Sequence, residues 1–231
     1  RNRVIQLGES PDRVFMVGGL GVDAIKRTKL LTRKSLERAL GFRFGKRNLL
    51  ITFHPVTLEE ASSELQMIEL LAALQKLEET NLIFTMPNSD TGNSKLIELV
   101  NDYVGTNPNA RAYSSLGSLR YLSCMLFVDG VVGNSSSGVA EAPTMKIGTV
   151  NIGDRQKGRI MADSIINCEP ERGAINDAIN KLYCPHFIKS LGDVKNPYGD
   201  GGASKRIVSI IKDIELRNIV KKSFYDFIGP H

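Results

Sequence analysis

The chain has 231 residues, 42% of them hydrophobic, which is enough to bury a sizeable core without disulfides or metals. This composition excludes a collagen-like, coiled-coil or largely disordered chain. No apolar run reaches the roughly 20 residues of a membrane span and no apolar signal segment opens the chain, so we expect a cytoplasmic protein with no membrane partner. The net charge is +5, but the basic residues are scattered and Trp is absent, which disfavours nucleic-acid binding.

Short β-rich runs alternate with helical patterns, which indicates an α/β fold with a doubly wound parallel sheet. The pattern predicts a helix at 2–8, and apolar residues at helical spacing predict further helices around 58–72 and 97–104. The predicted strands are 13–17, 49–53, 82–86, 110–113, 128–132, 147–152 and 164–167.

Both ends of the chain look like parts of a larger structure. The chain opens inside a helical pattern and closes with two apolar helical stripes, at 207–214 and 216–220, that no further strand follows. We therefore expect residues 1–204 to form a Rossmann-like nucleotide-binding domain, and residues 205–231 to be helices that pack against a domain outside this chain.

A glycine pattern follows the first predicted strand. Gly19, Gly21 and Ala24 have the spacing of a loose dinucleotide-binding fingerprint. That fingerprint also requires an acidic residue after the next strand, where the chain has His54. A tight glycine turn between strand and helix is the favoured interpretation, and we expect no nicotinamide cofactor.

His54 follows the second predicted strand and is fixed by Pro55. A histidine at this position can donate to a phosphate oxygen or transfer a proton, although backbone hydrogen bonds are an equally good explanation for a single histidine. No second His or Cys lies at ligand spacing, and the three cysteines are far apart, so we expect no metal site and no disulfide.

Polar residues follow three other predicted strands. Asn88 comes directly after the third strand, and the fifth strand leads into three serines flanked by glycines, with Glu141 one turn later. Serine hydroxyls and free N–H groups at a helix start can bind an anion, and a carboxylate can accept from two ribose hydroxyls. A serine-rich helix cap explains the same residues without a ligand. Arg155, after the sixth strand, adds a phosphate donor, or is part of a solvated charged surface.

Because ligands bind beyond the carboxyl ends of strands in an open parallel sheet, these loops together predict a nucleoside-diphosphate site. The segments that carry it also resemble the hydrolysing UDP-N-acetylglucosamine 2-epimerase family, closest to its sialic-acid-pathway branch. The matching segments are His54-Pro55-Val56-Thr57, Pro87-Asn88-Ser89-Asp90, Gly133-Asn134-Ser135-Ser136-Ser137-Gly138 with Glu141, Asn151-Ile152-Gly153-Asp154-Arg155-Gln156 and Asn196-Pro197-Tyr198-Gly199-Asp200-Gly201.

The resemblance implies a two-domain GT-B arrangement, of which this chain is the second domain, and a homodimer of the full-length protein. It implies that UDP-N-acetylglucosamine or UDP binds without any cofactor, with catalytic carboxylates in the other domain. The UDP-binding residues that it implies are Asn88, Ser135, Ser136, Glu141 and Arg155, with His54 as the catalytic residue beside the phosphate. The loop at 113–115 is expected near the base.

Two other functions remain open at this stage. A GT-B glycosyltransferase domain uses a similar carboxylate and glycine-rich loop for a nucleotide sugar, and a nucleotide-sugar-binding module would use them without turnover. The His-Pro-Val-Thr segment at His54 favours the epimerase, since a transferase gives no particular reason to expect it.

Overall fold

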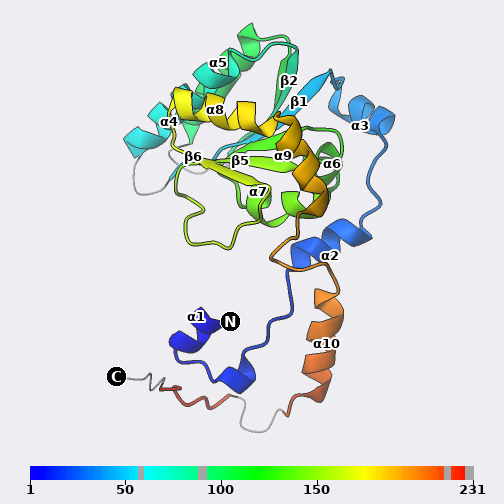
Figure 1. Ribbon diagram of the computed structural model, residues 1–231, viewed down its shortest axis with the longest axis vertical. Helices are drawn as coiled ribbons and strands as arrows, with labels where there is room; N and C mark the ends of the chain where they lie inside the picture. Colours follow the sequence, from blue (N-terminus) through cyan, green and yellow to red (C-terminus); the bar gives the residue numbers. More distant parts are fainter. Residues whose placement is uncertain (57–59, 88–92, 216–219, 227–231) are drawn as a thin grey trace.

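The computed structural model describes residues 1–56, 60–87, 93–215 and 220–226, and confirms the α/β fold (Figure 1). Six strands form one parallel sheet in the order β3-β2-β1-β4-β5-β6. The strands are β1 (Arg47–Thr52), β2 (Thr80–Thr85), β3 (Ala110–Tyr113), β4 (Gly130–Gly133), β5 (Gly148–Ile152) and β6 (Ile165–Cys168). The chain runs outward from β1 to β3 and then returns to place β4 beside β1. The switch point of this Rossmann-like sheet therefore lies between β1 and β4.

Helices cover both faces of the sheet. The helices are α1 (Asn2–Gln6), α2 (Leu20–Arg27), α3 (Arg33–Leu40), α4 (Glu60–Leu74), α5 (Ser94–Thr106), α6 (Gly117–Cys124), α7 (Ser136–Ala140), α8 (Arg172–Leu182), α9 (Pro185–Ser190) and α10 (Ala203–Asp213), with 3-10 turns η1 (Pro11–Arg13), η2 (Ala142–Met145) and η3 (Leu191–Asp193). None of the helices that the structure describes is long and apolar enough to span a membrane.

Alternation along the strands explains the two cores. Leu49 and Ile51 of β1 pack under α4, α5 and α8, whereas Leu50 packs with α2, α3 and α6 on the opposite face. Successive residues of a strand point to opposite faces, so a continuously apolar strand is buried on both sides. This is the reason that the apolar runs at 49–53, 82–86 and 128–132 predicted central strands correctly.

The predicted strand at 13–17 is wrong. Arg13 ends the 3-10 turn η1, and the residues after it pair with none of the described strands. Their carbonyl groups are bonded by arginine side chains instead, since Arg1 Nε donates to the carbonyl of Val14 at 3.1 Å and Arg206 Nε donates to that of Val17 at 2.9 Å. An apolar run that finds no neighbouring strand edge stays irregular.

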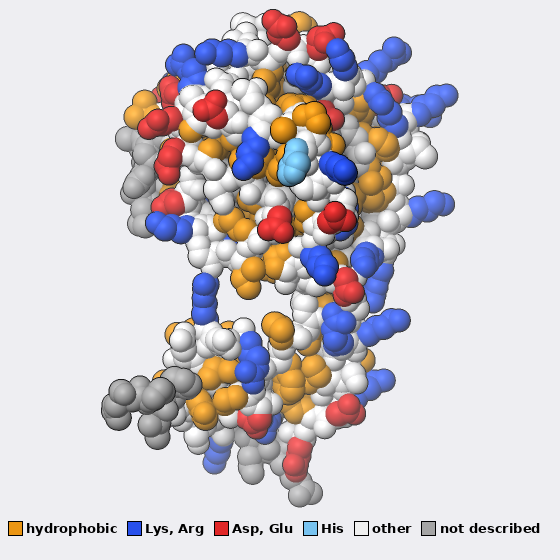
Figure 2. Space-filling model, viewed as in Figure 1, with side chains coloured by type: hydrophobic (Ala, Val, Ile, Leu, Met, Phe, Trp, Pro, Cys, Tyr) orange, Lys and Arg blue, Asp and Glu red, His pale blue; other side chains and the backbone are white. Residues whose placement is uncertain are grey.

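Residues 1–17, 203–215 and 220–226, which we call the terminal lobe, lie together away from the sheet (Figure 1). Tyr225 N donates to the carbonyl of Gly8 at 2.9 Å, which joins the two ends of the chain. Figure 2 shows hydrophobic side chains gathered on this lobe and an open space between it and the sheet domain, residues 20–195. Two glycine-containing connections, 18–19 and 196–202, join the lobe to the sheet domain. The division expected after residue 204 stays a prediction.

The helix predicted around 58–72 forms as α4. However, some residues of the face that we expected to be buried are exposed. Leu65 is 63% exposed and Ile68 39% exposed, while Met67, Leu70 and Leu74 are buried against the sheet. Apolar residues occur on all sides of α4, so their spacing alone does not select the face that packs.

Of the terminal helices, the stripe at 207–214 lies on α10, which buries only Ala203 among its described residues. The second predicted stripe, at 216–220, falls mainly outside the described residues.

Candidate functional site

The site begins where β1 and β4 end side by side. Gly133 closes β4 with a φ of 137°, and a Cβ there would lie 2.0 Å from the carbonyl oxygen of Thr52. Only glycine permits this approach. Asn134 directly follows β4, and His54 lies two residues after β1. The close approach of the two strand ends places Asn134 against His54.

Asn134 and His54 are joined by two hydrogen bonds. The backbone N–H of His54 donates to Asn134 Oδ1 at 2.7 Å, and Asn134 Nδ2 donates to the carbonyl of His54 at 2.8 Å. Asn134 is 1% exposed, so both bonds are shielded from water. The amide fixes the backbone of His54 at the switch point of the sheet, where nucleotides bind in folds of this type.

The loop after β5 reaches the same asparagine. Arg155 Nη1 donates to the backbone carbonyl of Asn134 at 3.0 Å, and Gln156 Nε2 donates to it at 2.8 Å. Gln156 is buried, and its Oε1 has no hydrogen-bond partner among the described residues. The structure therefore brings His54, Asn134 and Arg155 together from three different strand ends.

The electrostatics of His54 follow from this geometry. Burial is the main reason that the pKa of His54 lies below its ordinary value, and the positive charge of Arg155 lowers it further. His54 is therefore a neutral imidazole at pH 7. In that form it donates one N–H and accepts at its other ring nitrogen.

Ser135, Ser136 and Ser137 start the short helix α7 directly after Asn134. Ser135 is the N-cap, and its hydroxyl accepts from the backbone N–H of Ser137 at 3.4 Å. Ser136 is exposed and Ser135 half-buried. The serines therefore follow directly on Asn134, the residue that is bonded to both His54 and Arg155. The anion site at these residues stays a prediction.

Glu141 lies at the end of α7, one turn after the serines, and is half-buried. Burial raises the pKa of its carboxyl group above the ordinary value. The carboxylate faces α2, since a Cβ on Gly21 would lie 3.6 Å from Glu141 Oε1. Because Gly21 has no side chain, no side chain at position 21 contacts this carboxylate oxygen.

The glycine pattern at Gly19, Gly21 and Ala24 follows no strand, which removes the structural context of a dinucleotide fingerprint. Gly19 is the N-cap of α2, and its N–H donates to the carbonyl of Tyr198 at 2.7 Å. This bond instead joins the two connections to the terminal lobe. The expected glycine turn between a strand and a helix is therefore wrong in its strand, although Gly19 does begin a helix.

Asn196, in one of the segments that carried the resemblance, ties that segment to the site. Its Nδ2 donates to the carbonyl of Ala140 at 2.8 Å and to Thr144 Oγ1 at 2.7 Å, while its Oδ1 accepts from Tyr198 N at 2.9 Å. The connection 196–202 is thereby held against the end of α7. Asn134, Gln156 and Asn196 lie within the motifs found in the sequence, but the sequence alone offers no reason to assign them a role. The structural role of a side-chain amide can be identified only from its hydrogen-bond partners.

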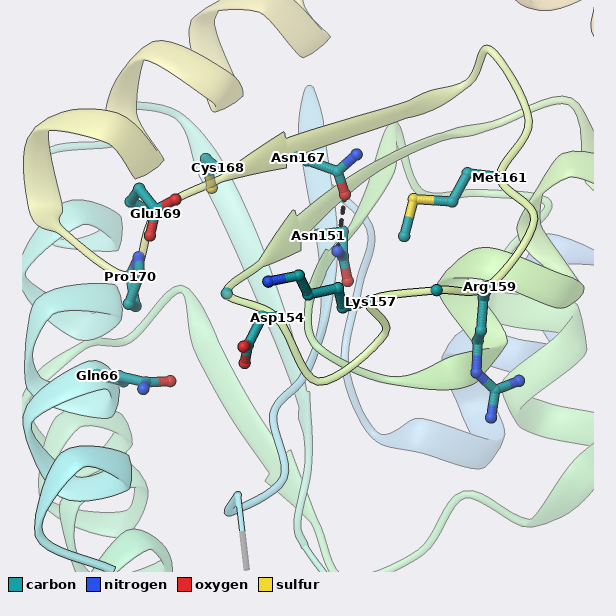
Figure 3. Close-up of a pocket in the computed structure, with 12 residues that line it drawn as sticks. Gln66, Asn151, Asp154, Lys157, Arg159, Met161, Asn167, Cys168, Glu169 and Pro170 are labelled. Carbon is teal, nitrogen blue, oxygen red and sulfur yellow. Dashed lines mark hydrogen bonds between the residues drawn. The ribbon is translucent and has the colours of Figure 1, made fainter. Parts of the chain in front are cut away.

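A cavity of about 760 Å³ opens at the ends of β5 and β6 (Figure 3). The amides of Asn151 and Asn167 meet there, with Asn151 Nδ2 donating to Asn167 Oδ1 at 2.8 Å. Side chains of both charges surround them, among them Asp154 and Lys157. None of the predicted site residues that the structure describes lines this cavity, but residues of the loop 153–159 that carries Arg155 do.

Two further expectations stay predictions. Asn88 lies outside the described residues. Tyr113, in the loop expected near the base, donates its hydroxyl hydrogen to the carbonyl of Leu40 at 2.8 Å, which holds that side chain against the end of α3. Among the described residues no group of three or more His, Cys, Asp or Glu side chains has the arrangement of a metal site.

Comparison with known proteins gives a consistent family. A family model described as UDP-N-acetylglucosamine 2-epimerase matches residues 1–212. The chain is 38% identical over 231 residues to the GDP/UDP-N,N'-diacetylbacillosamine 2-epimerase (hydrolyzing) of Campylobacter jejuni, covering 98% of this chain and 59% of the relative. It is 39% identical to the polysialic acid biosynthesis protein P7 of Escherichia coli, covering 98% of this chain and 58% of that protein.

Among solved structures, the UDP-N-acetylglucosamine 2-epimerase of Methanocaldococcus jannaschii in complex with UDP-N-acetylglucosamine and UDP superposes with a TM-score of 0.72. At 17% identity, over 91% of this chain and 58% of that one, the likeness supports the fold alone. The chain spans less than three fifths of the length of each of these three proteins.

Proposed function

The chain belongs to the UDP-N-acetylglucosamine 2-epimerase family, and on that basis we propose that it is the nucleotide-binding half of a hydrolysing 2-epimerase. The observation that carries the proposal is that His54 and Arg155 are both hydrogen-bonded to one buried residue, Asn134, which the serines at the start of α7 follow directly in the chain. Donors from three strand ends meet there at the switch point of the sheet.

In this proposal the diphosphate of UDP-N-acetylglucosamine, or of a related nucleotide sugar, lies against Ser135, Ser136 and Arg155. Arg155 is a planar cation that suits phosphate oxygens, and the serine hydroxyls donate to them. Glu141 accepts hydrogen bonds from the ribose hydroxyls. Asn88, by the resemblance, belongs to the same set.

The chemistry follows from what such a site supplies. The C2 proton of the sugar is weakly acidic because no carbonyl group is adjacent to C2. If the C1–O bond breaks early, the departing UDP carries the electron pair and the sugar becomes cation-like, which acidifies the C2 proton. Donors preorganised around the diphosphate stabilise the charge that develops there. Neutral His54 contributes one of these hydrogen bonds near the bond that breaks.

The remaining steps need groups that we place outside this chain. A carboxylate of the other domain removes the C2 proton and leaves a C1=C2 glycal. Water then adds its hydroxyl to C1 and a proton to C2 on the opposite face. The sum is UDP-N-acetylglucosamine plus water giving N-acetylmannosamine plus UDP, with no redox change and no cofactor.

The names of the relatives leave two substrate choices, since one acts on diacetylbacillosamine linked to GDP or UDP. We propose UDP-N-acetylglucosamine because the His-Pro-Val-Thr segment resembles the sialic-acid-pathway branch. The overall identities, 38% and 39%, do not separate the two relatives.

A product assay in D₂O tests the function. The longer protein that contains this chain is incubated with UDP-N-acetylglucosamine, and the products are followed by NMR. Free UDP and N-acetylmannosamine deuterated at C2 support the proposal. Sugar transfer to an acceptor with C2 unlabelled would instead identify a glycosyltransferase, and tight UDP binding without turnover would identify a binding module. Parallel reactions with UDP- and GDP-linked diacetylbacillosamine decide the sugar and the base.

A further inference from the structure

A tyrosine outside all the motifs contacts the serines of α7. Tyr121 is a half-buried residue of α6, and its hydroxyl is hydrogen-bonded to Ser137 Oγ. Ser137 Oγ in turn lies 3.2 Å from Ser135 Oγ. Tyr121 therefore reaches the N-cap of α7 through one intervening hydroxyl, and the proposed function gives it no role.

Either oxygen could be the donor in each of these two hydroxyl pairs, and counting donors limits which way the hydrogens point. A hydroxyl has one hydrogen to donate and two lone pairs to accept. Ser135 Oγ already accepts from the backbone N–H of Ser137. If Ser137 Oγ also donates to it, both lone pairs of Ser135 are used. The hydrogen of Ser135 then has no acceptor within this set of hydroxyls and is available to a ligand.

Tyr121 is what makes Ser137 the donor in that pair. A phenol is more acidic than an aliphatic hydroxyl and is the better donor of the two, so we assign the hydrogen of this bond to Tyr121, with Ser137 Oγ as the acceptor. Burial raises the pKa of Tyr121, which keeps the phenol protonated, although its hydrogen bonds to Ser137 and Thr52 oppose that rise. Thr52 Oγ1 is itself 2.7 Å from Thr85 Oγ1, so hydroxyls at the ends of β1 and β2 extend the chain behind Tyr121.

We propose that Tyr121 is a positioning residue, which acts through Ser137 to direct the hydrogen of Ser135 toward the diphosphate of the bound nucleotide. This inference rests on the proposed function, since it needs the diphosphate at Ser135. It adds a residue from a different helix, which no motif contains.

The test uses the Tyr121→Phe variant of the full chain, which keeps the ring and removes only the hydroxyl. Binding of UDP and of inorganic pyrophosphate is measured by calorimetry, and thermal unfolding is measured for each variant. We expect both ligands to bind about 3- to 10-fold more weakly, the usual size of one neutral hydrogen bond. Tyr183→Phe is the matched control, because that hydroxyl contacts Asp129, at the opposite end of the strands.

A double-mutant cycle separates positioning from general loosening. If Tyr121 acts through Ser135, Tyr121→Phe should cause no further loss of pyrophosphate binding in a Ser135→Ala background. Ser137→Ala should reproduce the loss of Tyr121→Phe, and it keeps the test valid if the tyrosine variant does not fold.

Each outcome has one meaning. Equal losses in the presence and absence of Ser135 would overturn the inference, as would unchanged pyrophosphate binding by folded Tyr121→Phe. Both results would leave the proposed function standing, because the unmodified chain still binds UDP. An unmodified chain that binds neither UDP nor pyrophosphate would overturn the proposed function and this inference with it.

Discussion

Asp23 in α2 accepts hydrogen bonds from the start of α10, 181 residues later, at Ser204. The backbone N–H of Ser204 donates to Asp23 Oδ2 at 2.8 Å, the Ser204 hydroxyl donates to the same oxygen, and the N–H of Ala203 donates to Oδ1 at 3.1 Å. Asp23 is 5% exposed. The buried carboxylate of Asp23 therefore caps the N-terminus of α10 and ties this helix of the terminal lobe to the sheet domain.

Replacing Asp23 with Ala should loosen α10 without disturbing the sheet. We expect the amides of α10 to exchange with solvent faster, while those of β1 keep their protection, because only the cap of α10 is lost. Hydrogen exchange followed by NMR measures both. Asp213→Ala, in the last turn of α10, is the control. Equal acceleration in β1 would show that Asp23 stabilises the whole domain.

The same contact has a pH dependence. The hydroxyl of Ser204, more than any other group, holds the pKa of Asp23 well below its ordinary 3.8. A lowered folded-state pKa stabilises the fold above the ordinary value and is lost as pH falls through the folded one. The difference in protection of α10 between the unmodified chain and Asp23→Ala should therefore be constant above about pH 5 and shrink only in strong acid.

Replacing Glu141 with Ala should weaken UDP binding by about 1.5–3 kcal/mol, because charge-assisted hydrogen bonds to the ribose are lost. Inorganic pyrophosphate has no ribose, so its binding should change little. Calorimetry with both ligands makes the comparison. Equal losses for UDP and pyrophosphate would contradict the assignment of Glu141 to the ribose.

Glu141 should also show a cost to stability. Burial raises its folded-state pKa, so folding favours the protonated form, and stability falls as pH rises through the folded value. Glu141→Gln replaces the half-buried carboxylate with a neutral amide of similar shape, and should therefore raise the melting temperature at pH 7. Well below the ordinary value of 4.5, at about pH 3, where the carboxyl group is protonated in both the folded and the unfolded state, the pH-dependent part of this difference should be gone. A variant that is less stable at pH 7 would contradict this.

Replacing His54 with Gln in the longer protein should lower turnover about 10²-fold while UDP affinity falls much less. The reason is that His54 acts on charge that develops as the C1–O bond breaks, not on the ground state. Steady-state kinetics and UDP calorimetry give the two numbers, and His186→Gln on α9 is the control. Unchanged turnover would leave His54 with only its backbone role at Asn134.

The 231-residue chain by itself should bind UDP, but should release no N-acetylmannosamine. The proposed phosphate and ribose contacts all come from one sheet, whereas the proton-abstracting carboxylate is proposed to lie in another domain. Because this chain supplies only one side of the proposed cleft, we expect its Kd for UDP to lie roughly in the high micromolar to millimolar range. NMR titration with UDP and a product assay on the same sample make the check. Turnover by this chain would mean that its own carboxylates do the chemistry.

The sequence by itself determined the sheet. Central parallel strands are buried on both faces, so runs such as 49–53 and 128–132 are continuously apolar and can be recognised locally. Polar residues at the strand ends, His54 and Ser135 among them, were recognisable for the same reason, because the carboxyl edge of such a sheet is where ligands bind.

Tertiary structure decided what depends on partners far along the chain. Residues 13–17 have the composition of a strand, but Arg1 and Arg206 bond the carbonyls of Val14 and Val17, and only the folded chain shows this. The same holds for Asn134, whose amide holds His54 across 80 residues, and for Tyr121, whose hydroxyl meets Ser137. A hydrogen bond between distant segments leaves no periodicity in the sequence, because its geometry exists only after the sheet has brought the two strand ends together.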